Sequence, residues 1–92
     1  MTDFEDAVLE VITSLERGEV VTYGEVADQA GFPGAARAVG TVLRTCDGDV
    51  PWWRVVGAGG VIRTPGKERQ ADLLRSEGIL VMEGKVVGTG NR

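Results

Sequence analysis

The chain has 92 residues, of which 42% are hydrophobic and 26% charged, the composition of one small folded domain. It contains no histidine and a single cysteine, which excludes a zinc site of cysteines and histidines, an internal disulfide and any catalytic arrangement with a histidine base. The net charge of −4 weighs against nucleic-acid binding, because domains that bind nucleic acids are usually basic.

The first predicted element is an amphipathic helix. Apolar residues recur at intervals of three or four positions, with acidic side chains on the opposite face. These apolar residues are Phe4, Val8, Val11, Ile12 and Leu15. The spacing predicts a helix from about Thr2 to Arg17 that ends at Gly18, followed by a short extended link over residues 19–21.

The next two predicted helices flank a turn. Thr22 and Glu25 have the spacing of a capping box, which predicts a short second helix that runs to about Ala30. Residues 31–34, Gly-Phe-Pro-Gly, have the composition of a turn, and residues 35–44 are predicted to form a third helix with small residues on one side. Two short helices around a turn that contains glycine are typical of a helix-turn-helix.

The second half of the chain is predicted to combine short extended segments with one helix. The expected elements are a polar loop over residues 45–50, a strand over 53–56, a tight turn over 57–60, a return strand or loop over 61–63, a fourth helix over 67–77 and two strands over 79–82 and 85–87.

The fourth helix and the final strands complete the predicted fold. Ala71, Leu73 and Leu74 would face the core, and Gly78 would cap the helix at its C-terminal end. Glu83-Gly84, between two apolar runs, indicates a hairpin. A helix-turn-helix with further helices and short strands predicts an α+β domain of the winged-helix type.

The charges are divided unequally along the chain. The first twenty residues carry six acids and one base, whereas residues 37–75 carry seven bases and four acids. The positive charge is therefore concentrated where the motifs lie, which permits DNA binding despite the net charge. Non-specific affinity is nevertheless expected to be weak and sensitive to salt.

The sequence lacks the features of exported and membrane proteins. No apolar run approaches the roughly 20 residues that a membrane span needs, and the first six residues are acidic, unlike the basic start of a signal peptide. A single cysteine fits a reducing compartment. We expect a cytoplasmic protein whose residues 1–92 form one domain, without a membrane partner.

The most informative segment is residues 51–56, Pro-Trp-Trp-Arg-Val-Val, which contains both tryptophans. It resembles the active-site motif of the O6-alkylguanine-DNA alkyltransferases, Pro-Cys-His-Arg-Val, with Trp52 in place of the nucleophilic cysteine and Trp53 in place of the histidine that activates it. Indole is neither a nucleophile nor a base. The chain is therefore similar to the alkyltransferase-like proteins, non-enzymatic relatives that bind alkylguanine lesions and hand them to nucleotide excision repair.

The resemblance extends over nearly the whole chain. Residues 18–27 look like the family segment Gly-x-Val-x-Thr-Tyr-Gly-x-(Ile/Val)-Ala, residues 36–40 like its recognition helix, and residues 70–78 like its last helix. Glu77 matches the glutamate that completes the enzymes' relay, and here we expect it to have a structural role, paired with Arg54. Trp53 is bulkier than the family's residue at that position.

The resemblance implies functions for individual residues. Tyr23 matches the tyrosine that presses on the phosphate of the target nucleotide, and Arg37 matches the arginine that enters the duplex and fills the space left by the flipped base. Small residues would let the third helix approach the minor groove closely. The implied lesion-pocket residues are Trp52, Tyr23, Arg63 and Val55. The implied DNA-binding residues are Arg37, Tyr23, Thr22, Ala36, Ala38 and Gly40.

The ligands and partners follow from the same resemblance. It implies double-stranded DNA that contains O6-alkylguanine as the ligand, and proteins of nucleotide excision repair as partners. No metal, organic cofactor or catalytic residue is implied, and the protein is expected to be a monomer.

Other interpretations of these residues stay open. Paired tryptophans often pack in a core, and we expect this of Trp53, whereas Trp52 is expected in the pocket wall. The domain could be a winged-helix module that recognises undamaged sequence. It could also be an active alkyltransferase that uses Cys46, although Asp47 and Asp49 beside this residue would disfavour the reactive thiolate.

Overall fold

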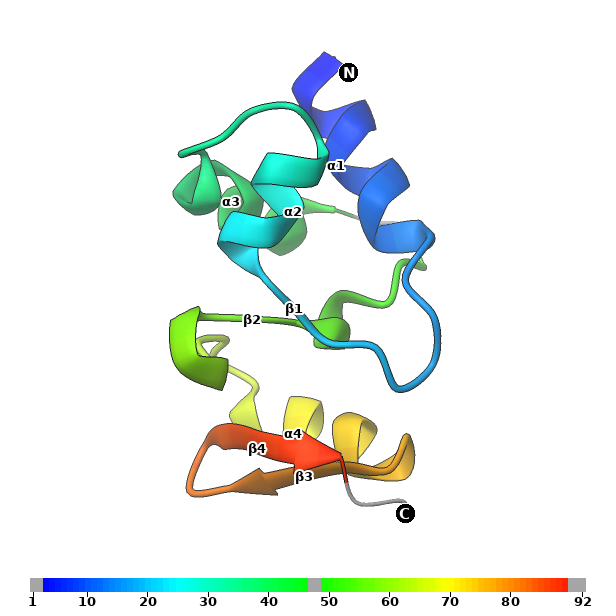
Figure 1. Ribbon diagram of the computed structural model, residues 1–92, viewed down its shortest axis with the longest axis vertical. Coiled ribbons are helices and arrows are strands. Elements are labelled where there is room, and N and C mark those ends of the chain that lie inside the picture. Colours follow the sequence, from blue (N-terminus) through cyan, green and yellow to red (C-terminus); the bar gives the residue numbers. More distant parts are fainter. Residues whose placement is uncertain (1–2, 47–48, 90–92) are drawn as a thin grey trace.

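The computed structural model describes residues 3–46 and 49–89. Their elements in chain order are α1 (Asp3–Thr13), β1 (Val21–Thr22), α2 (Tyr23–Gln29), α3 (Ala36–Thr45), the 3-10 turn η1 (Trp52–Arg54), β2 (Val55–Val56), the 3-10 turn η2 (Ala58–Gly60), α4 (Lys67–Ser76), β3 (Ile79–Met82) and β4 (Lys85–Thr89). Figure 1 shows α1, α2 and α3 at one end of the molecule and α4 with the β3–β4 hairpin at the other. The predicted α+β fold with a helix-turn-helix and short strands is confirmed.

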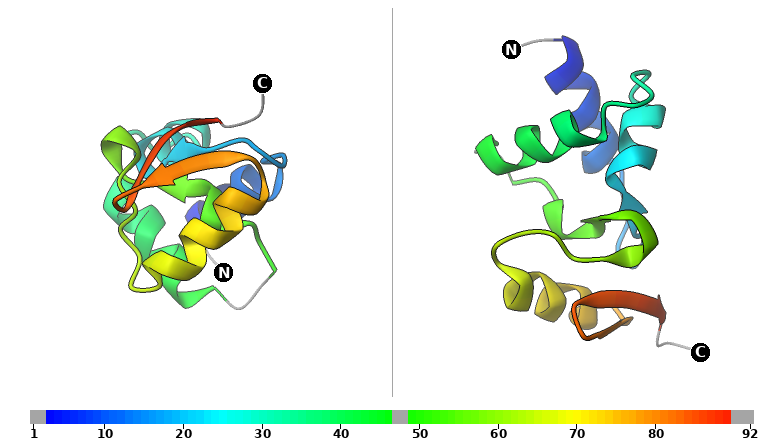
Figure 2. Two further views of the ribbon diagram at one scale, coloured as in Figure 1. Left: turned by 90° about the horizontal axis from the view of Figure 1, so that it is seen from below. Right: turned by 90° about the vertical axis from the view of Figure 1, so that its left-hand side faces the viewer.

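Strand β2 divides the hydrophobic interior into two parts. It pairs in parallel with β1, Val21 beside Val55 and Thr22 beside Val56. Because neighbouring residues of a strand point to opposite sides, Val55 joins the cluster under α1, α2 and α3, the upper core, and Val56 joins the cluster under α4 and the hairpin, the lower core. Figure 2 shows this crossing segment between the two halves.

Among the described residues, no helix has the length and apolar character needed to cross a membrane.

The helix-turn-helix begins with the predicted capping box. The Thr22 hydroxyl accepts a hydrogen bond from the Glu25 amide at 3.1 Å, and the Glu25 carboxylate accepts one from the Thr22 amide at 2.7 Å. Two of the orphan amide groups at the start of α2 are thereby satisfied. The turn before α3 contains Gly31 and Gly34, both with positive φ, so the prediction of a turn at residues 31–34 is confirmed.

The first helix is shorter than predicted. It ends at Thr13 rather than near Arg17, and the predicted start at Thr2 lies outside the described residues. Leu15 is still buried in the upper core, which explains why its apolar spacing resembled a further helical turn. Just beyond the helix, the Leu15 carbonyl accepts a hydrogen bond at 2.8 Å from Arg54, a partner from a distant segment.

The predicted strand over residues 53–56 is only half formed. Residues 52–54 make the turn η1 instead, closed by a hydrogen bond of 3.1 Å from the Arg54 amide to the Pro51 carbonyl. The buried side chain of Gln70 on α4 donates to the carbonyls of Trp53 and Val55 at 2.9 and 3.0 Å. The Gln70 side chain thus binds the carbonyl groups that a neighbouring strand would bind if residues 53–56 formed the predicted strand.

The last predicted elements are confirmed. Helix α4 ends at Ser76, followed by Gly78 with a φ of 85°. Ala71 and Leu74 are buried, while Leu73 is half-buried. The hairpin turns at Glu83-Gly84, with Met82 paired to Lys85. The second strand extends to Thr89, two residues beyond its predicted end.

Candidate nucleic-acid interface

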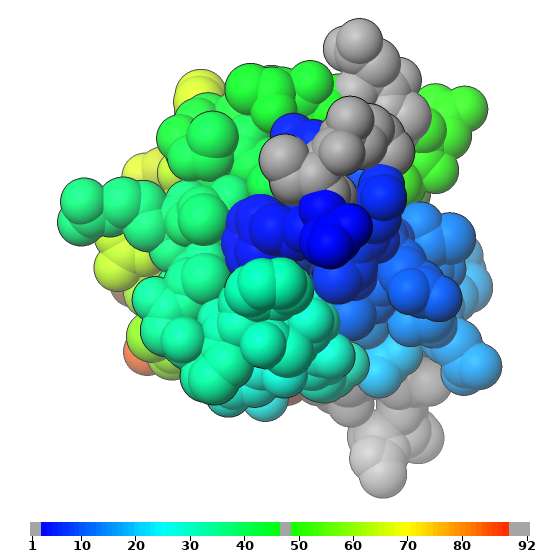
Figure 3. Space-filling view, turned by 90° about the horizontal axis from the view of Figure 1, so that it is seen from above, coloured from blue at the N-terminus to red at the C-terminus, as the bar shows by residue number. Residues whose placement is uncertain are grey.

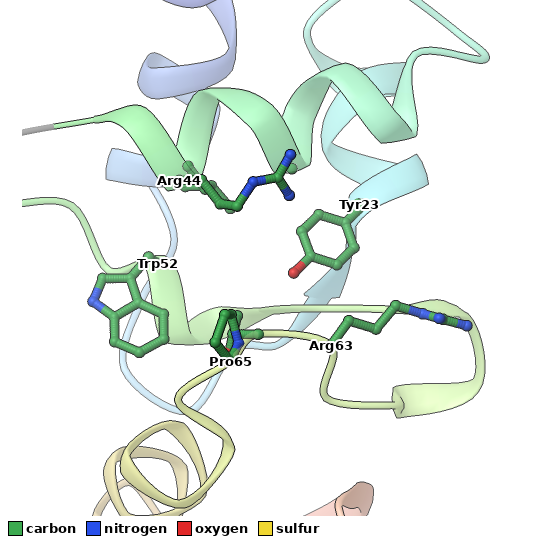
Figure 4. Close-up of a pocket in the computed structure, with 8 residues that line it drawn as sticks. Tyr23, Arg44, Trp52, Arg63 and Pro65 are labelled. Atoms are coloured by element: carbon green, nitrogen blue, oxygen red, sulfur yellow. The ribbon is translucent and has the colours of Figure 1, made fainter.

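A cavity of about 200 Å³ lies where α2, α3, η1 and the segment before α4 meet. It is lined by Tyr23, Gly40, Leu43, Arg44, Trp52, Arg63, Thr64 and Pro65. Figure 4 shows Trp52 and Tyr23 on opposite sides, with the Tyr23 hydroxyl directed inward, Arg44 above and Pro65 below. The cavity is therefore bounded by aromatic and apolar surfaces with a few polar groups, the usual composition of a small-molecule or base pocket.

A wider groove adjoins the cavity. It is lined by Thr22, Tyr23, Gly24, Ala36, Arg37, Gly40, Arg44, Gly57, Ala58 and Arg63. Four residues line both spaces, namely Tyr23, Gly40, Arg44 and Arg63. The cavity therefore opens onto the groove along the exposed side of α3.

The spacing of residues along α3 creates this surface. Arg37, Gly40 and Arg44 recur at intervals of three and four and so lie on one side of the helix, while Val39 and Val42 are buried on the other. Gly40 keeps the surface open. A Cβ atom at this position would lie 3.6 Å from Nη1 of Arg44 and 4.0 Å from the Tyr23 ring.

The groove is positively charged although the protein is not. Arg37, Arg44 and Arg63 are exposed, and none of them forms an ion pair with an acid in the described part of the chain. The acids of the first turn of α1, Asp3, Glu5 and Asp6, do not line the groove; α1 forms the middle of the surface seen in Figure 3. Three of the basic residues that the sequence concentrates between positions 37 and 75 thus meet in one groove of the structure.

The Tyr23 hydroxyl is neutral at physiological pH. Burial raises the pKa of Tyr23 above its ordinary value of 10.0, and the positive charges of Arg44 and Arg63 lower it by a smaller amount. A neutral hydroxyl beside two guanidinium groups can donate a hydrogen bond to an anionic oxygen. It can therefore take part in binding a phosphate.

Next to the cavity, Glu77 connects the end of α4 to the loop after α1 and to the turn η1. We call the residues that make this connection, Gly18, Trp53, Arg54 and Glu77, the Glu77 junction. Nε and Nη2 of Arg54 donate to the two carboxylate oxygens at 3.0 and 2.8 Å. The Gly18 amide and the Trp53 indole each donate at 2.8 Å. The carboxylate is therefore hydrogen-bonded by groups from two distant parts of the chain, the loop after α1 and the turn η1.

The Glu77 carboxyl is strongly acidic in this environment. Burial raises its pKa, but the hydrogen bonds from Arg54, Gly18 and Trp53, together with the Arg54 charge, outweigh burial and lower the pKa from its ordinary 4.5 to about 2. Glu77 is accordingly an ionised acceptor at neutral pH. The structural role and the pairing with Arg54 that the sequence predicted are what the structure shows.

The two tryptophans occupy different environments. Trp53 packs against the lower core, holds Glu77 and lies against Arg54, whose guanidinium carbon is 5.4 Å from the ring centroid. Trp52 lines the cavity, edge to face with Trp53, with ring centroids 6.0 Å apart and planes at 87°. The junction thus supports the aromatic wall of the cavity from behind.

Most of the site residues predicted from the sequence lie together. Three of the four lesion-pocket residues, Tyr23, Trp52 and Arg63, line the cavity. Five of the six DNA-binding residues line the groove; they are Thr22, Tyr23, Ala36, Arg37 and Gly40. The guanidinium of Arg63, however, points away from Trp52, because its aliphatic part runs along Gly57 (Figure 4).

One predicted pocket residue needs correction, and one predicted DNA-binding residue lies outside the groove. Val55 has no exposed surface, because β2 directs it into the upper core, and so it does not line the cavity. Ala38 is exposed on α3 but does not line the groove, because two helical residues turn it well away from Ala36 and Gly40.

Several lining residues were not predicted, and they include Arg44, Leu43, Thr64 and Pro65. Arg44 could have been found, because it lies seven residues after Arg37 and therefore on the same side of the helix. Cys46 follows α3 as its C-terminal cap and lines neither space. Within residues 3–46 and 49–89, no cluster of three or more acidic or cysteine side chains could hold a metal ion.

The model of the 6-O-methylguanine DNA methyltransferase DNA-binding domain matches residues 3–79 of the chain. The chain belongs to this family. A DNA base-flipping protein of Vibrio parahaemolyticus is 41% identical to it over 91 residues, which are 94% of this chain and 91% of that protein. Alkyltransferase-like protein 1 of Schizosaccharomyces pombe is 34% identical, with 90% and 82% covered. The predicted similarity to alkyltransferase-like proteins is confirmed.

Solved structures agree with the sequence relatives. The S. pombe protein Atl1, in complex with damaged DNA containing O6-carboxymethylguanine, superimposes with a TM-score of 0.84 at 33% identity, with 94% of this chain and 88% of that chain covered. A Mycobacterium tuberculosis OGT in complex with DNA gives 0.76 at 41% identity, with 84% and 50% covered. The chain therefore spans about half of the methyltransferase and nearly all of Atl1.

Proposed function

We propose that this protein is a sensor of alkylated DNA. It binds the minor groove of double-stranded DNA through the helix-turn-helix, rotates an O6-alkylguanine out of the stack and holds it in the cavity without removing the alkyl group. The observation that carries the proposal is a cavity with an aromatic wall, Trp52, that opens onto a groove with three arginines, none of which forms an ion pair with an acid in the described part of the chain.

The groove provides the docking surface. The small residues Ala36 and Gly40 let α3 approach the DNA closely. Arg37 lines the groove on the same side of the helix and fills the space that the rotated base leaves. Because unpairing costs least at an already damaged base pair, part of the selectivity arises before the base reaches the cavity.

The cavity provides recognition of the adduct. Its volume of about 200 Å³ suits a single base with a small substituent rather than a larger ligand. An alkyl group that packs against Trp52 and Pro65 leaves water, which is worth roughly 0.8 kcal/mol for each buried methylene. Tyr23 closes the opposite side and lies close enough to the groove to contact the phosphate of the same nucleotide.

The same cavity explains why no alkyl transfer is expected. Trp52, aligned with the family's nucleophilic cysteine, has no nucleophilic atom, and the chain has no histidine to serve as a base. Glu77 is engaged by Arg54 and the Trp53 indole. With these groups committed to structure, the protein holds the lesion as a monomeric single domain in the cytoplasm until excision-repair proteins are recruited.

The deciding experiment compares two duplexes of identical sequence, one with a single O6-methylguanine, at a stated salt concentration. We expect the lesion to be bound at least tenfold more tightly, about 1.4 kcal/mol. Arg37→Ala and Trp52→Ala should reduce this preference, whereas Arg69→Ala, an exposed change on α4 outside both spaces, should not. Lesion affinity that survives both Arg37→Ala and Trp52→Ala would disprove the mechanism.

Other outcomes point to the remaining functions. Equal binding to the two duplexes, with preference among undamaged sequences, would favour a sequence-reading module. Mass spectrometry after incubation with O6-methylguanine DNA tests for transfer to Cys46. We expect no added methyl mass, and an increment that disappears in Cys46→Ser would show an active transferase.

A further inference from the structure

Arg44 occupies the boundary between the cavity and the groove. It lines both spaces, and in Figure 4 its side chain runs over the cavity toward Tyr23. One guanidinium nitrogen, Nη2, donates to the Thr41 hydroxyl at 3.2 Å, an interaction within the last turns of α3. The side chain is therefore directed along the helix toward the opening (Figure 4), where it is exposed.

The charge at this opening has no acidic partner. Arg44 forms no ion pair with an acid among residues 3–46 and 49–89, and Arg63 lines the same opening. The Arg44 guanidinium runs toward the Tyr23 ring (Figure 4), and a positive charge without a counter-ion favours an anion beside it. The opening thus has the chemistry of an oxyanion site before any ligand is present.

The path of a bound nucleotide brings an anion to this position. The cavity accommodates a base, so the sugar and the phosphodiester on either side must remain at the opening, where the cavity meets the groove. A guanidinium group matches a phosphate geometrically and can bind two of its oxygens. On α3, Arg44 is the basic residue that lines both the cavity, which holds the base, and the groove, which faces the duplex.

We propose that Arg44 binds a backbone phosphate next to the rotated nucleotide, and that this contact forms only when the base is in the cavity. The inference rests on the proposed function, because it requires a base to enter the cavity. It gives Arg44 a task different from that of Arg37, which lines the groove but not the cavity. Arg44 stabilises the rotated state and so increases the preference for damaged DNA.

The first test is the salt dependence of binding. Each phosphate contact contributes a slope of about −0.9 to the plot of log affinity against log salt concentration. For Arg44→Gln we expect the slope on O6-methylguanine DNA to become about one unit shallower, with affinity about tenfold weaker. On the undamaged duplex the slope should be the same as for the unmodified protein.

The second test locates the phosphate. Uncharged methylphosphonates replace, one at a time, the phosphates flanking the lesion. At one of them the unmodified protein should lose about tenfold in affinity and Arg44→Gln should lose nothing further, because both changes remove the same contact. Arg69→Gln is the matched control, since this exposed arginine of α4 lines neither space, and its loss at each methylphosphonate should equal that of the unmodified protein.

The outcomes separate this inference from the proposed function. If the unmodified protein prefers the lesion but Arg44→Gln changes the slope equally on both duplexes, or on neither, the inference is wrong and the proposed function stands. If the unmodified protein shows no preference for the lesion, both are wrong. Arg44 is exposed, and its hydrogen bond among the described residues is to Thr41 of the same helix, so thermal unfolding of the variant should match that of the parent.

Discussion

The groove and the Glu77 junction use arginine in opposite ways. In the junction, Arg54 is mostly buried and its guanidinium donates to the Glu77 carboxylate and the Leu15 carbonyl. In the groove, Arg37 and Arg44 are exposed and have no acidic partner in the described part of the chain. The partners, rather than the residue type, determine whether an arginine stabilises the fold or remains available for an anionic ligand.

The two regions are also placed differently with respect to the core. The junction joins the loop after α1, the turn η1 and the end of α4, so it connects segments that pack on both the upper and lower cores. The groove lies on the outer side of α3, where side chains can change without disturbing either core. Changes in the junction should therefore affect stability, and changes in the groove should affect binding.

The largest expected effect is the loss of the junction's negative charge. Glu77→Gln keeps the side-chain size but leaves the Arg54 charge buried without a counter-ion, and removing one partner of a buried pair costs about 3 to 5 kcal/mol. Urea unfolding should show this loss with an unchanged dependence on denaturant.

A matched control exists on the surface. Asp72 and Arg75 form an exposed pair on α4 with a nitrogen–oxygen distance of 3.6 Å. Asp72→Asn should change the free energy of unfolding by less than about 1 kcal/mol. If the two variants were equally stable, the junction would not be the structural clamp that its geometry indicates.

A related effect is expected on acidification. The pKa of Glu77 is about 2 in the folded protein and 4.5 ordinarily, so ionised Glu77 stabilises the fold above pH 4.5. This contribution, about 3 kcal/mol in full, is lost as the pH falls from 4.5 toward 2. Unfolding free energies across this range should fall less steeply for Glu77→Gln than for the parent, and parallel curves would contradict the assignment.

Gly40→Ala is expected to have smaller effects of opposite sign, a more stable fold and weaker binding of the lesion. The new Cβ would lie at ordinary contact distances from Arg44 and Tyr23, so the helix should gain about 1 kcal/mol from the better helix-forming residue. The same methyl group would occupy the wall shared by the cavity and the groove, and lesion binding should weaken. Thermal melting and binding to the two duplexes measure both quantities, and stronger binding would show that α3 does not face the DNA.

The smallest effect on stability is expected for Arg37→Gln. Its side chain is exposed and forms no ion pair with a described acid, so the free energy of unfolding should change by less than about 0.5 kcal/mol. DNA affinity should nevertheless fall. Loss of affinity accompanied by loss of stability would mean that the separation between the two regions is incomplete.

Local patterns predicted the parts of the fold that depend on neighbouring residues. Thr22 and Glu25 identified the start of α2, and Glu83-Gly84 identified the hairpin turn, because each device is complete within a few residues. The end of α1 could not be predicted in this way. Just beyond this end, the Leu15 carbonyl binds Arg54, and these two residues are 39 positions apart in the sequence.

The candidate site shows the same division. The resemblance of residues 51–56 pointed to Trp52, and the groove residues of α3 followed from its recognition-helix motif. Val55 was misplaced because the direction of a side chain on β2 depends on the parallel pairing with β1, which the sequence does not reveal. Leu43, Thr64 and Pro65 were missed because an apolar wall formed by two distant segments has no local signature.

The two perpendicular tryptophans allow ligand binding to be followed by the intrinsic fluorescence of the unlabelled protein. The chain has no other tryptophan, so all of its indole fluorescence comes from Trp52 in the cavity wall and Trp53, which is hydrogen-bonded to Glu77. A base stacked near Trp52 should quench the emission of that residue, whereas opening of the junction should alter that of Trp53. Trp52→Phe and Trp53→Phe would isolate the two signals, so that the arrival of a nucleotide and the loosening of the scaffold could be timed separately.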